Sequence, residues 1–152
     1  MQLFLFMKRL LWVICLLYIF SACRKNEEAG EINGSWKLIA VYDKTNGTIN
    51  HAPTGSNIDV VITFLSRNSF AGHTLRNSFS DGKFNQNGNE ITFEGFSMTK
   101  IAEDEWGGSF LTVLNACLLQ STNPCRPSII TIQGNNMKLT TPLRYDVTLQ
   151  KL

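Results

Sequence analysis

The feature that most constrains the fold is a series of short segments with the composition and period of β-strands. In residues 34–42, Trp36, Leu38, Ala40 and Tyr42 alternate with their neighbours and therefore share one face of an extended strand. Further segments are short and rich in β-branched or aromatic residues, namely residues 58–64, 69–73, 83–86, 90–94, 129–133, 137–140 and 145–149. The sequence therefore predicts a mainly β domain with an antiparallel sheet of about seven or eight strands, partly closed.

Turn-forming residues separate these segments. Asn87-Gly88 lies between two predicted strands and indicates a type I′ hairpin, in which both central residues need a positive φ. Gly134-Asn135-Asn136 indicates a second hairpin near the C-terminus. Residues 43–57 contain two glycines and a proline, and we expect them to form a long loop.

One stretch has the period of a helix instead. The apolar or sulfur-containing residues that recur at spacings of three and four are Trp106, Phe110, Val113, Leu114 and Cys117. Asp104 and Glu105 precede them, where a helix start favours negative charge, and Pro124 ends any continuation. We expect one helix of about ten to twelve residues that packs this stripe on the sheet, in an α+β arrangement.

The N-terminus resembles a bacterial export signal. An uncharged run, residues 10–20, is followed by Phe20-Ser21-Ala22-Cys23, which resembles a lipobox, whose cysteine takes a diacylglyceryl thioether. We expect residues 1–22 to be a lipoprotein signal peptide, Cys23 to carry the lipid, and residues 23–31 to form a flexible tether. An uncleaved anchor and a conventional signal peptide are the alternatives.

The predicted signal peptide and lipid anchor indicate where the protein is located and which partners it has. We expect a lipid-anchored monomer in the bacterial cell envelope, in the outer membrane, on its periplasmic face or at the cell surface. Loss of residues 1–22 takes away Lys8 and Arg9 and leaves 12 of the 14 basic side chains against 12 acidic ones. A domain without net charge lacks the basic face that neutralises phosphates, so nucleic acid is not an expected partner.

Two of the four cysteines remain for the mature domain, Cys117 and Cys125. In an oxidising compartment, such a pair predicts a disulfide. The bridge closes a nine-residue loop, for which loop-closure entropy gives about 2.6 kcal/mol of stabilisation. Two free thiols are the alternative. A metal site is not expected, because no second set of ligands has a suitable spacing.

Several landmarks resemble a known family when they are taken in order. They are Gly34-Ser35-Trp36-Lys37-Leu38, Phe70-Ala71-Gly72 before Asn77, Ser80-Asp81-Gly82-Lys83-Phe84, Gly88-Asn89-Glu90-Ile91-Thr92-Phe93, Met98-Thr99-Lys100-Ile101-Ala102, a helical segment 110–114 and Ile132-Gln133-Gly134-Asn135-Asn136-Met137-Lys138-Leu139. Their order resembles the META domain of HslJ-like, heat-shock-related proteins. The resemblance implies one such domain over residues 32–152 and a non-enzymatic envelope role, in contact with other envelope proteins or in stress tolerance. A lipocalin-like module for a small apolar or glycan ligand, which also opens with a Gly-x-Trp strand, is the alternative.

The sequence departs from this family at two positions. The family often has Cys just before the Asn that matches Asn77, and Cys just after the segment that matches residues 99–102. Arg76 and Glu103 occupy these places here. We predict that Arg76 and Glu103 lie close enough to form an ion pair.

Candidate catalytic and metal-binding residues are few. The spacing of His51 and His73 matches no metal motif. Glu103, Asp104 and Glu105 are consecutive, so their carboxylates point in different directions at a helix start and do not form an acid/base pair. Neither a Gly-x-Ser-x-Gly nor a Cys-His nucleophile motif appears. We therefore expect a non-enzymatic protein, with no catalytic residues, metal or cofactor.

The ligand-binding residues stay open at this point. The aromatic residues are expected mostly in the core, where they supply large buried area. If the domain binds a ligand, we expect a cleft between sheet and helix, near Trp106 or in residues 43–57. A pocket of several hundred Å³ with apolar walls and converging polar groups would favour a binding module. A packed interior with an apolar surface patch would favour a protein that contacts other envelope proteins.

Overall fold

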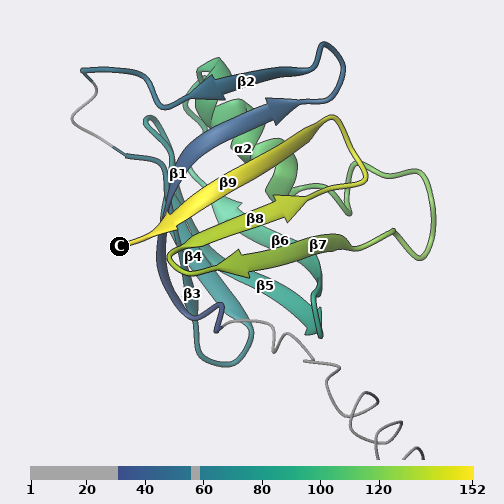
Figure 1. Cartoon of the computed structure of the whole chain (residues 1–152). Coiled ribbons are helices and arrows are strands. Elements are labelled where there is room, and N and C mark those ends of the chain that lie inside the picture. Colours follow the sequence, from purple (N-terminus) through teal and green to yellow (C-terminus); the bar gives the residue numbers. More distant parts are fainter. Residues whose placement is uncertain (1–30, 56–58) are drawn as a thin grey trace, which may run out of the picture.

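The computed structural model describes residues 31–55 and 59–152. In this part of the chain, eight antiparallel strands close into a barrel, and a further strand, β2, pairs with β1 alone (Figure 1). The strands are β1 (Gly34–Asp43), β2 (Thr48–His51), β3 (Val61–Leu65), β4 (Ser69–His73), β5 (Ser78–Asn87), β6 (Glu90–Met98), β7 (Ser128–Gln133), β8 (Asn136–Thr140) and β9 (Tyr145–Lys151). A helix, α2 (Glu105–Leu114), packs against β1 and β9. The predicted mainly β, antiparallel fold with one packed helix is confirmed, and the sheet closes fully because β9 pairs with β1.

Strand β1 closes the barrel because it pairs with three other strands. Its first half pairs with β3, its second half with β2, and its opposite edge with β9. The pairing with β9 is irregular around Ile39, and beyond this bulge the alternation of side chains reverses. Val41 and Asp43 are therefore the buried residues of the second half. The prediction that Ala40 and Tyr42 share one face with Trp36 and Leu38 was wrong for this reason.

Strand β2 lies within the segment predicted to be a long loop, residues 43–57. Its four residues pair with the second half of β1, and all four are exposed. A short strand that is exposed on both faces has no alternation of apolar and polar residues to detect. The loop prediction was therefore wrong over Thr48–His51, and this strand forms an arm beside the barrel.

Both predicted hairpins are present, but the first turn differs from its prediction. Between β5 and β6 the turn residues are Gly88 and Asn89, and of these only Gly88 has a positive φ, of 59°. A type I′ turn needs a positive φ at both positions, so the predicted turn type was wrong. A glycine at the first position alone is typical of type II′. Gly134 holds the same position in the β7–β8 turn, with a φ of 58°.

Aromatic side chains fill the barrel interior. Phe64, Phe70 and Phe93 are at most 2% exposed, and their ring centroids lie 5.3–6.5 Å apart. Gly82 on β5 allows the neighbouring strand to bring a ring against its backbone, because a Cβ there would lie 2.5 Å from the Phe70 ring. This interior is a packed core, as in small barrels whose inward side chains fill the lumen.

Helix α2 has the predicted apolar face. Trp106, Phe110, Val113 and Leu114 are buried, and Phe110 packs on the aromatic core. Cys117 lies beyond the end of the helix at Leu114. No helix in the described part of the chain is long and apolar enough to cross a membrane. The predicted signal peptide and Cys23 lie outside the described residues.

Candidate functional site

A cleft of about 400 Å³ opens between β2 and the first turn of α2. Its floor consists of three largely buried side chains, Val41, Trp106 and Ser109. Its rim consists of Asn50, His51, Pro53, Leu75, Asp104 and Glu105. The lining therefore combines apolar surface with carboxylate, amide, imidazole and hydroxyl groups, a combination typical of small-molecule sites.

The first turn of α2 supplies the acidic side of the cleft. Asp104 is the N-cap residue, and its Oδ1 accepts a hydrogen bond of 2.8 Å from the Gly107 N–H. Its Oδ2 lies 3.9 Å from Nε of Arg76. Glu105 is exposed at the rim, while Ser109 Oγ donates a hydrogen bond of 2.8 Å to the Glu105 carbonyl. One oxygen of Asp104 is thus used by the helix, whereas the Glu105 carboxylate faces solvent.

Of the three consecutive acidic residues, Glu103 points away from the other two. Two of them line the cleft, but Glu103 turns towards the β4–β5 connection. Glu103 Oε2 accepts hydrogen bonds from Thr74 Oγ1 at 2.7 Å and from Asn77 Nδ2 at 2.8 Å. The predicted ion pair between Arg76 and Glu103 is not formed, because Arg76 lies beside Asp104 and Glu103 is engaged by these polar side chains.

Asn77 fixes the segment that leads into α2. Its Oδ1 accepts hydrogen bonds from Thr99 Oγ1 at 3.0 Å and from the Ile101 N–H at 2.8 Å. Its Nδ2 donates to the Ile101 carbonyl and to Glu103, each at 2.8 Å. The side chain is buried and uses its full hydrogen-bonding capacity. This network therefore positions the helix start that forms one wall of the cleft.

An ion pair between the buried Asp43 and the half-exposed Arg144 lies where β1 ends and β9 begins. Arg144 binds the Asp43 carboxylate through both Nη2, at 2.6 Å, and Nε, at 2.9 Å. Its hydrogen bond is the main cause that lowers the pKa of Asp43 to about 2. The same bond is the main cause that raises the pKa of Arg144, and Glu105 adds a smaller attraction.

A second hollow, of about 420 Å³, lies on the other face of the β2 arm. It is lined by Ala40, Tyr42, Ile49, His51, Lys138 and Thr148. Since successive side chains of a strand point to opposite faces, Asn50 belongs to the first cleft and Ile49 to this hollow. The two neighbouring positions therefore offer a matched pair for mutagenesis.

The two histidines lie in different parts of the structure. His51, at the end of β2, lines both the cleft and the second hollow. His73 lies at the end of β4, with Nδ1 3.3 Å from the Thr74 carbonyl oxygen. Among residues 31–55 and 59–152, no group of three or more His, Cys, Asp or Glu side chains is arranged to hold a metal ion.

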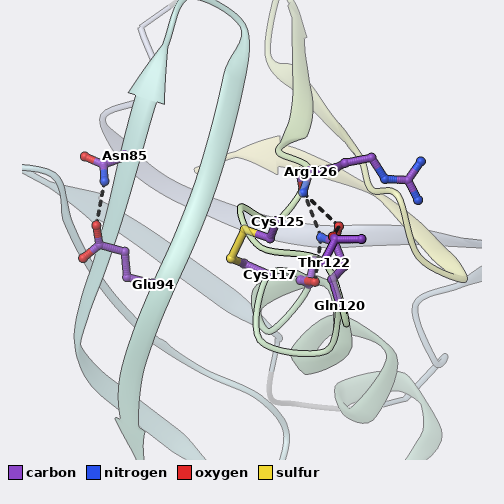
Figure 2. Close-up of a disulfide and its surroundings, with 8 residues drawn as sticks. Asn85, Glu94, Cys117, Gln120, Thr122, Cys125 and Arg126 are labelled. Carbon is purple, nitrogen blue, oxygen red and sulfur yellow. Dashed lines mark hydrogen bonds between the residues drawn. A yellow bond between two sulfur atoms is a disulfide. The ribbon is translucent and has the colours of Figure 1, made fainter.

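Cys117 and Cys125 form the predicted disulfide, with Cα atoms 5.3 Å apart. Figure 2 shows Gln120 turned towards the Arg126 backbone beside this bridge. The Gln120 side chain donates to the Arg126 carbonyl at 3.0 Å and accepts from the Arg126 N–H at 2.9 Å. The bridge and these two bonds hold together the loop that follows α2.

The structure brings together the two places where the sequence predicts a ligand cleft. Trp106 lies at the floor, and residues of the 43–57 segment lie at the rim. Val41, Leu75 and Ser109 were missed, because nothing in their local sequence distinguishes them from ordinary core or turn residues. They converge only when the barrel closes and α2 packs on it.

The comparisons with known proteins extend to the fold alone. The sequence matches no family model and no curated protein. The structure is similar to the NMR structure of a protein from Burkholderia xenovorans, with a TM-score of 0.56 and 16% identity, over 79% of this chain and 82% of that one. A second NMR structure gives 0.54 and 18%, over 78% and 89% of the two chains.

A crystal structure of a DUF4847 family protein from Bacteroides vulgatus gives a TM-score of 0.51 and 13% identity, over 83% of this chain and 95% of that one. At such low sequence identities, these similarities indicate a shared fold and do not indicate a shared activity. The chain has a closed antiparallel barrel with one helix, and its overall fold is similar to the folds of these solved proteins.

Proposed function

We propose that this protein is a non-enzymatic binding module of the cell envelope, and that its ligand site is the cleft between β2 and α2. The observation that carries the proposal is the cleft itself. It has a volume of about 400 Å³, an apolar floor with Trp106 and Val41, and polar groups that converge from β2 and α2. These are the features that distinguish a small-molecule site from an ordinary surface depression.

The site differs from a lipocalin calyx. The barrel interior is occupied by aromatic side chains such as Phe64 and Phe70, which are at most 2% exposed. A ligand is therefore expected beside the barrel and not inside it. The open end of the cleft leaves the ligand partly exposed, so we expect modest affinity and rapid exchange.

A blocking substitution tests the proposal. Asn50→Trp places a large side chain on the cleft face of β2, and Ile49→Trp places the same side chain on the opposite face of the arm. Thermal shift of the full chain against saccharides, fatty acids, amino acids and polyamines should reveal a class that stabilises the wild type and Ile49→Trp but not Asn50→Trp. Stabilisation by no class, or equal stabilisation of all three proteins, would contradict the proposal.

The envelope location rests on the N-terminal pattern. The lipobox-like residues before Cys23 and the META-like order of landmarks support a lipoprotein of the HslJ type. Figure 1 shows the start of β1 at the end of the barrel away from β2 and α2, so an anchor there would leave the cleft accessible. Metabolic labelling with palmitate should mark the wild type and not Cys23→Ser; label in both would remove this part of the proposal.

A second candidate function is contact with another envelope protein. Leu118 and Leu119, in the loop braced by the disulfide, are 63% and 58% exposed. Exposed apolar side chains on a braced loop favour a protein contact. Crosslinking in membranes should yield an adduct that Leu118→Asp abolishes, and an adduct that this substitution leaves unchanged would count against the loop.

A further inference from the structure

The cleft has an apolar floor and a mainly polar rim. Trp106 and Val41 form the apolar part of the floor, whereas Asn50, Asp104 and Glu105 offer oxygen and nitrogen atoms at the rim, beside the apolar Leu75. A ligand that satisfies both sides needs one apolar face and several hydrogen-bonding groups around its edge. The chemical class of the ligand can therefore be inferred from the ligands that the rim and the floor of the cleft disfavour.

The rim excludes a purely apolar ligand. An acyl chain lying across the cleft would remove water from the Glu105 carboxylate and from the exposed Asn50 amide without offering hydrogen bonds in return. Burial of polar groups without partners is costly, and most costly for a charged group. The same carboxylates disfavour an anionic ligand, and the described lining contains no lysine or arginine to offset them.

A nearby guanidinium reduces the tendency of Asp104 to bind a cationic ligand. Asp104 Oδ1 is occupied by the Gly107 N–H, and its Oδ2 lies 3.9 Å from the guanidinium of Arg76. Asp104 thus already has a positive neighbour, while the free lone pairs of both carboxylates still accept hydrogen bonds.

Hydroxyl groups fit these remaining acceptors. A hydroxyl that donates to a carboxylate forms a charge-assisted hydrogen bond, which is stronger than one between neutral groups. The Asn50 amide both donates and accepts, as vicinal hydroxyls require. The C–H face of a sugar ring is apolar and can pack on the indole of Trp106.

We propose that the ligand of the β2–α2 cleft is a saccharide unit, uncharged and rich in hydroxyl groups, bound with its apolar face towards Trp106 and its hydroxyls towards Glu105 and Asn50. This inference rests on the proposed function and names the ligand class of the same site. It predicts that affinity depends on the Glu105 carboxylate as a hydrogen-bond acceptor and not on net charge.

Titration calorimetry of the full chain tests the proposal, in a polyoxyethylene detergent that carries no sugar. The probes are glucose, maltotriose, N-acetylglucosamine and its trimer, with decanoate and spermidine as an acyl and a cationic probe. At least one saccharide should bind. Glu105→Gln should weaken that binding about tenfold, because a neutral acceptor replaces a charged one. Glu94→Gln, the same change at an exposed position of β6, should leave it unchanged.

Two further results separate this inference from the proposed function. Saccharide affinity should change less than about twofold between roughly 50 and 500 mM salt, because no ionic contact with the ligand is formed. If decanoate or spermidine binds in a manner that Asn50→Trp abolishes, and no saccharide binds, the saccharide assignment is wrong while the cleft stays a binding site. If no probe binds, the saccharide assignment is also wrong.

Discussion

Replacement of Asn77 by alanine removes the side chain that holds the segment before α2. Asn77 makes three hydrogen bonds to neutral groups and one to the Glu103 carboxylate. At about 1 kcal/mol for each neutral bond and about 2 kcal/mol for the charged one, the upper limit is about 5 kcal/mol. Thr99 and Ile101 are exposed, so water replaces part of what they lose. We expect Asn77→Ala to lower the free energy of unfolding by about 3 kcal/mol.

Chemical denaturation followed by tryptophan fluorescence measures this change, with Asn85→Ala as the matched control. Asn85 is exposed and makes one hydrogen bond, to Glu94, at 2.6 Å. Its replacement should cost less than about 0.5 kcal/mol. A loss below about 1 kcal/mol for Asn77→Ala, or equal losses for the two variants, would refute the role given to this network.

The isosteric variant Asn77→Asp adds a pH-dependent test. It places a second carboxylate beside Glu103, and like charges raise the pKa of the new group above its unfolded value of about 3.9. A raised pKa gives stability that is complete below the unfolded value and is lost as pH rises through the folded value. Asn77→Asp should therefore be more stable relative to wild type at about pH 4 than at about pH 7. A relative stability that does not change with pH would contradict this reasoning.

Three further predictions concern the fold. Gly82→Ala should lower the free energy of unfolding by about 1–3 kcal/mol, measured by denaturation, because its Cβ would lie 2.5 Å from an aromatic ring; a neutral effect would contradict that packing. Reductant should increase the mass of the domain by two hydrogen atoms, and an unchanged mass after denaturation in reductant would contradict the disulfide. Joint replacement of Cys117 and Cys125 by alanine should lower the free energy of unfolding by up to about 2.6 kcal/mol. The pKa of Asp43 is lowered to about 2, so its bond to Arg144 stabilises the fold above about pH 4 and is lost as pH falls towards 2. Asp43→Asn should therefore reduce the loss of melting temperature between about pH 4 and pH 2. An unchanged dependence of the melting temperature on acid pH would contradict this prediction.

Local patterns predicted those parts of the fold that depend on neighbouring residues. The stripe around Phe110 predicted α2, and the alternation of Trp36 and Leu38 predicted the first half of β1. The bulge at Ile39 depends on the pairing with β9, more than a hundred residues later in the chain, so the local pattern could not indicate it. Strand β2 was missed because its exposure on both faces leaves no apolar period.

The candidate site was predictable only in part. Trp106 and the 43–57 segment were singled out, but the remaining lining residues come from separate elements that meet on closure of the barrel. The ion pair of Asp43 and Arg144 could not be predicted either, because the two residues are 101 positions apart and meet only in the closed barrel. Arg76 was predicted to pair with Glu103, yet the neighbouring Asp104 faces it, since the direction of a side chain at a helix start depends on the capping bond.

Methyl NMR during a ligand titration tests most directly whether the cleft is the binding site. Val41 and Leu75 line the cleft, whereas Met137 and Leu149 face each other across β8 and β9 in the core. A ligand of the β2–α2 cleft should shift the Val41 and Leu75 methyl signals and leave those of Met137 and Leu149 in place. Shifts confined to Met137 and Leu149 would place the ligand inside the barrel and contradict the account.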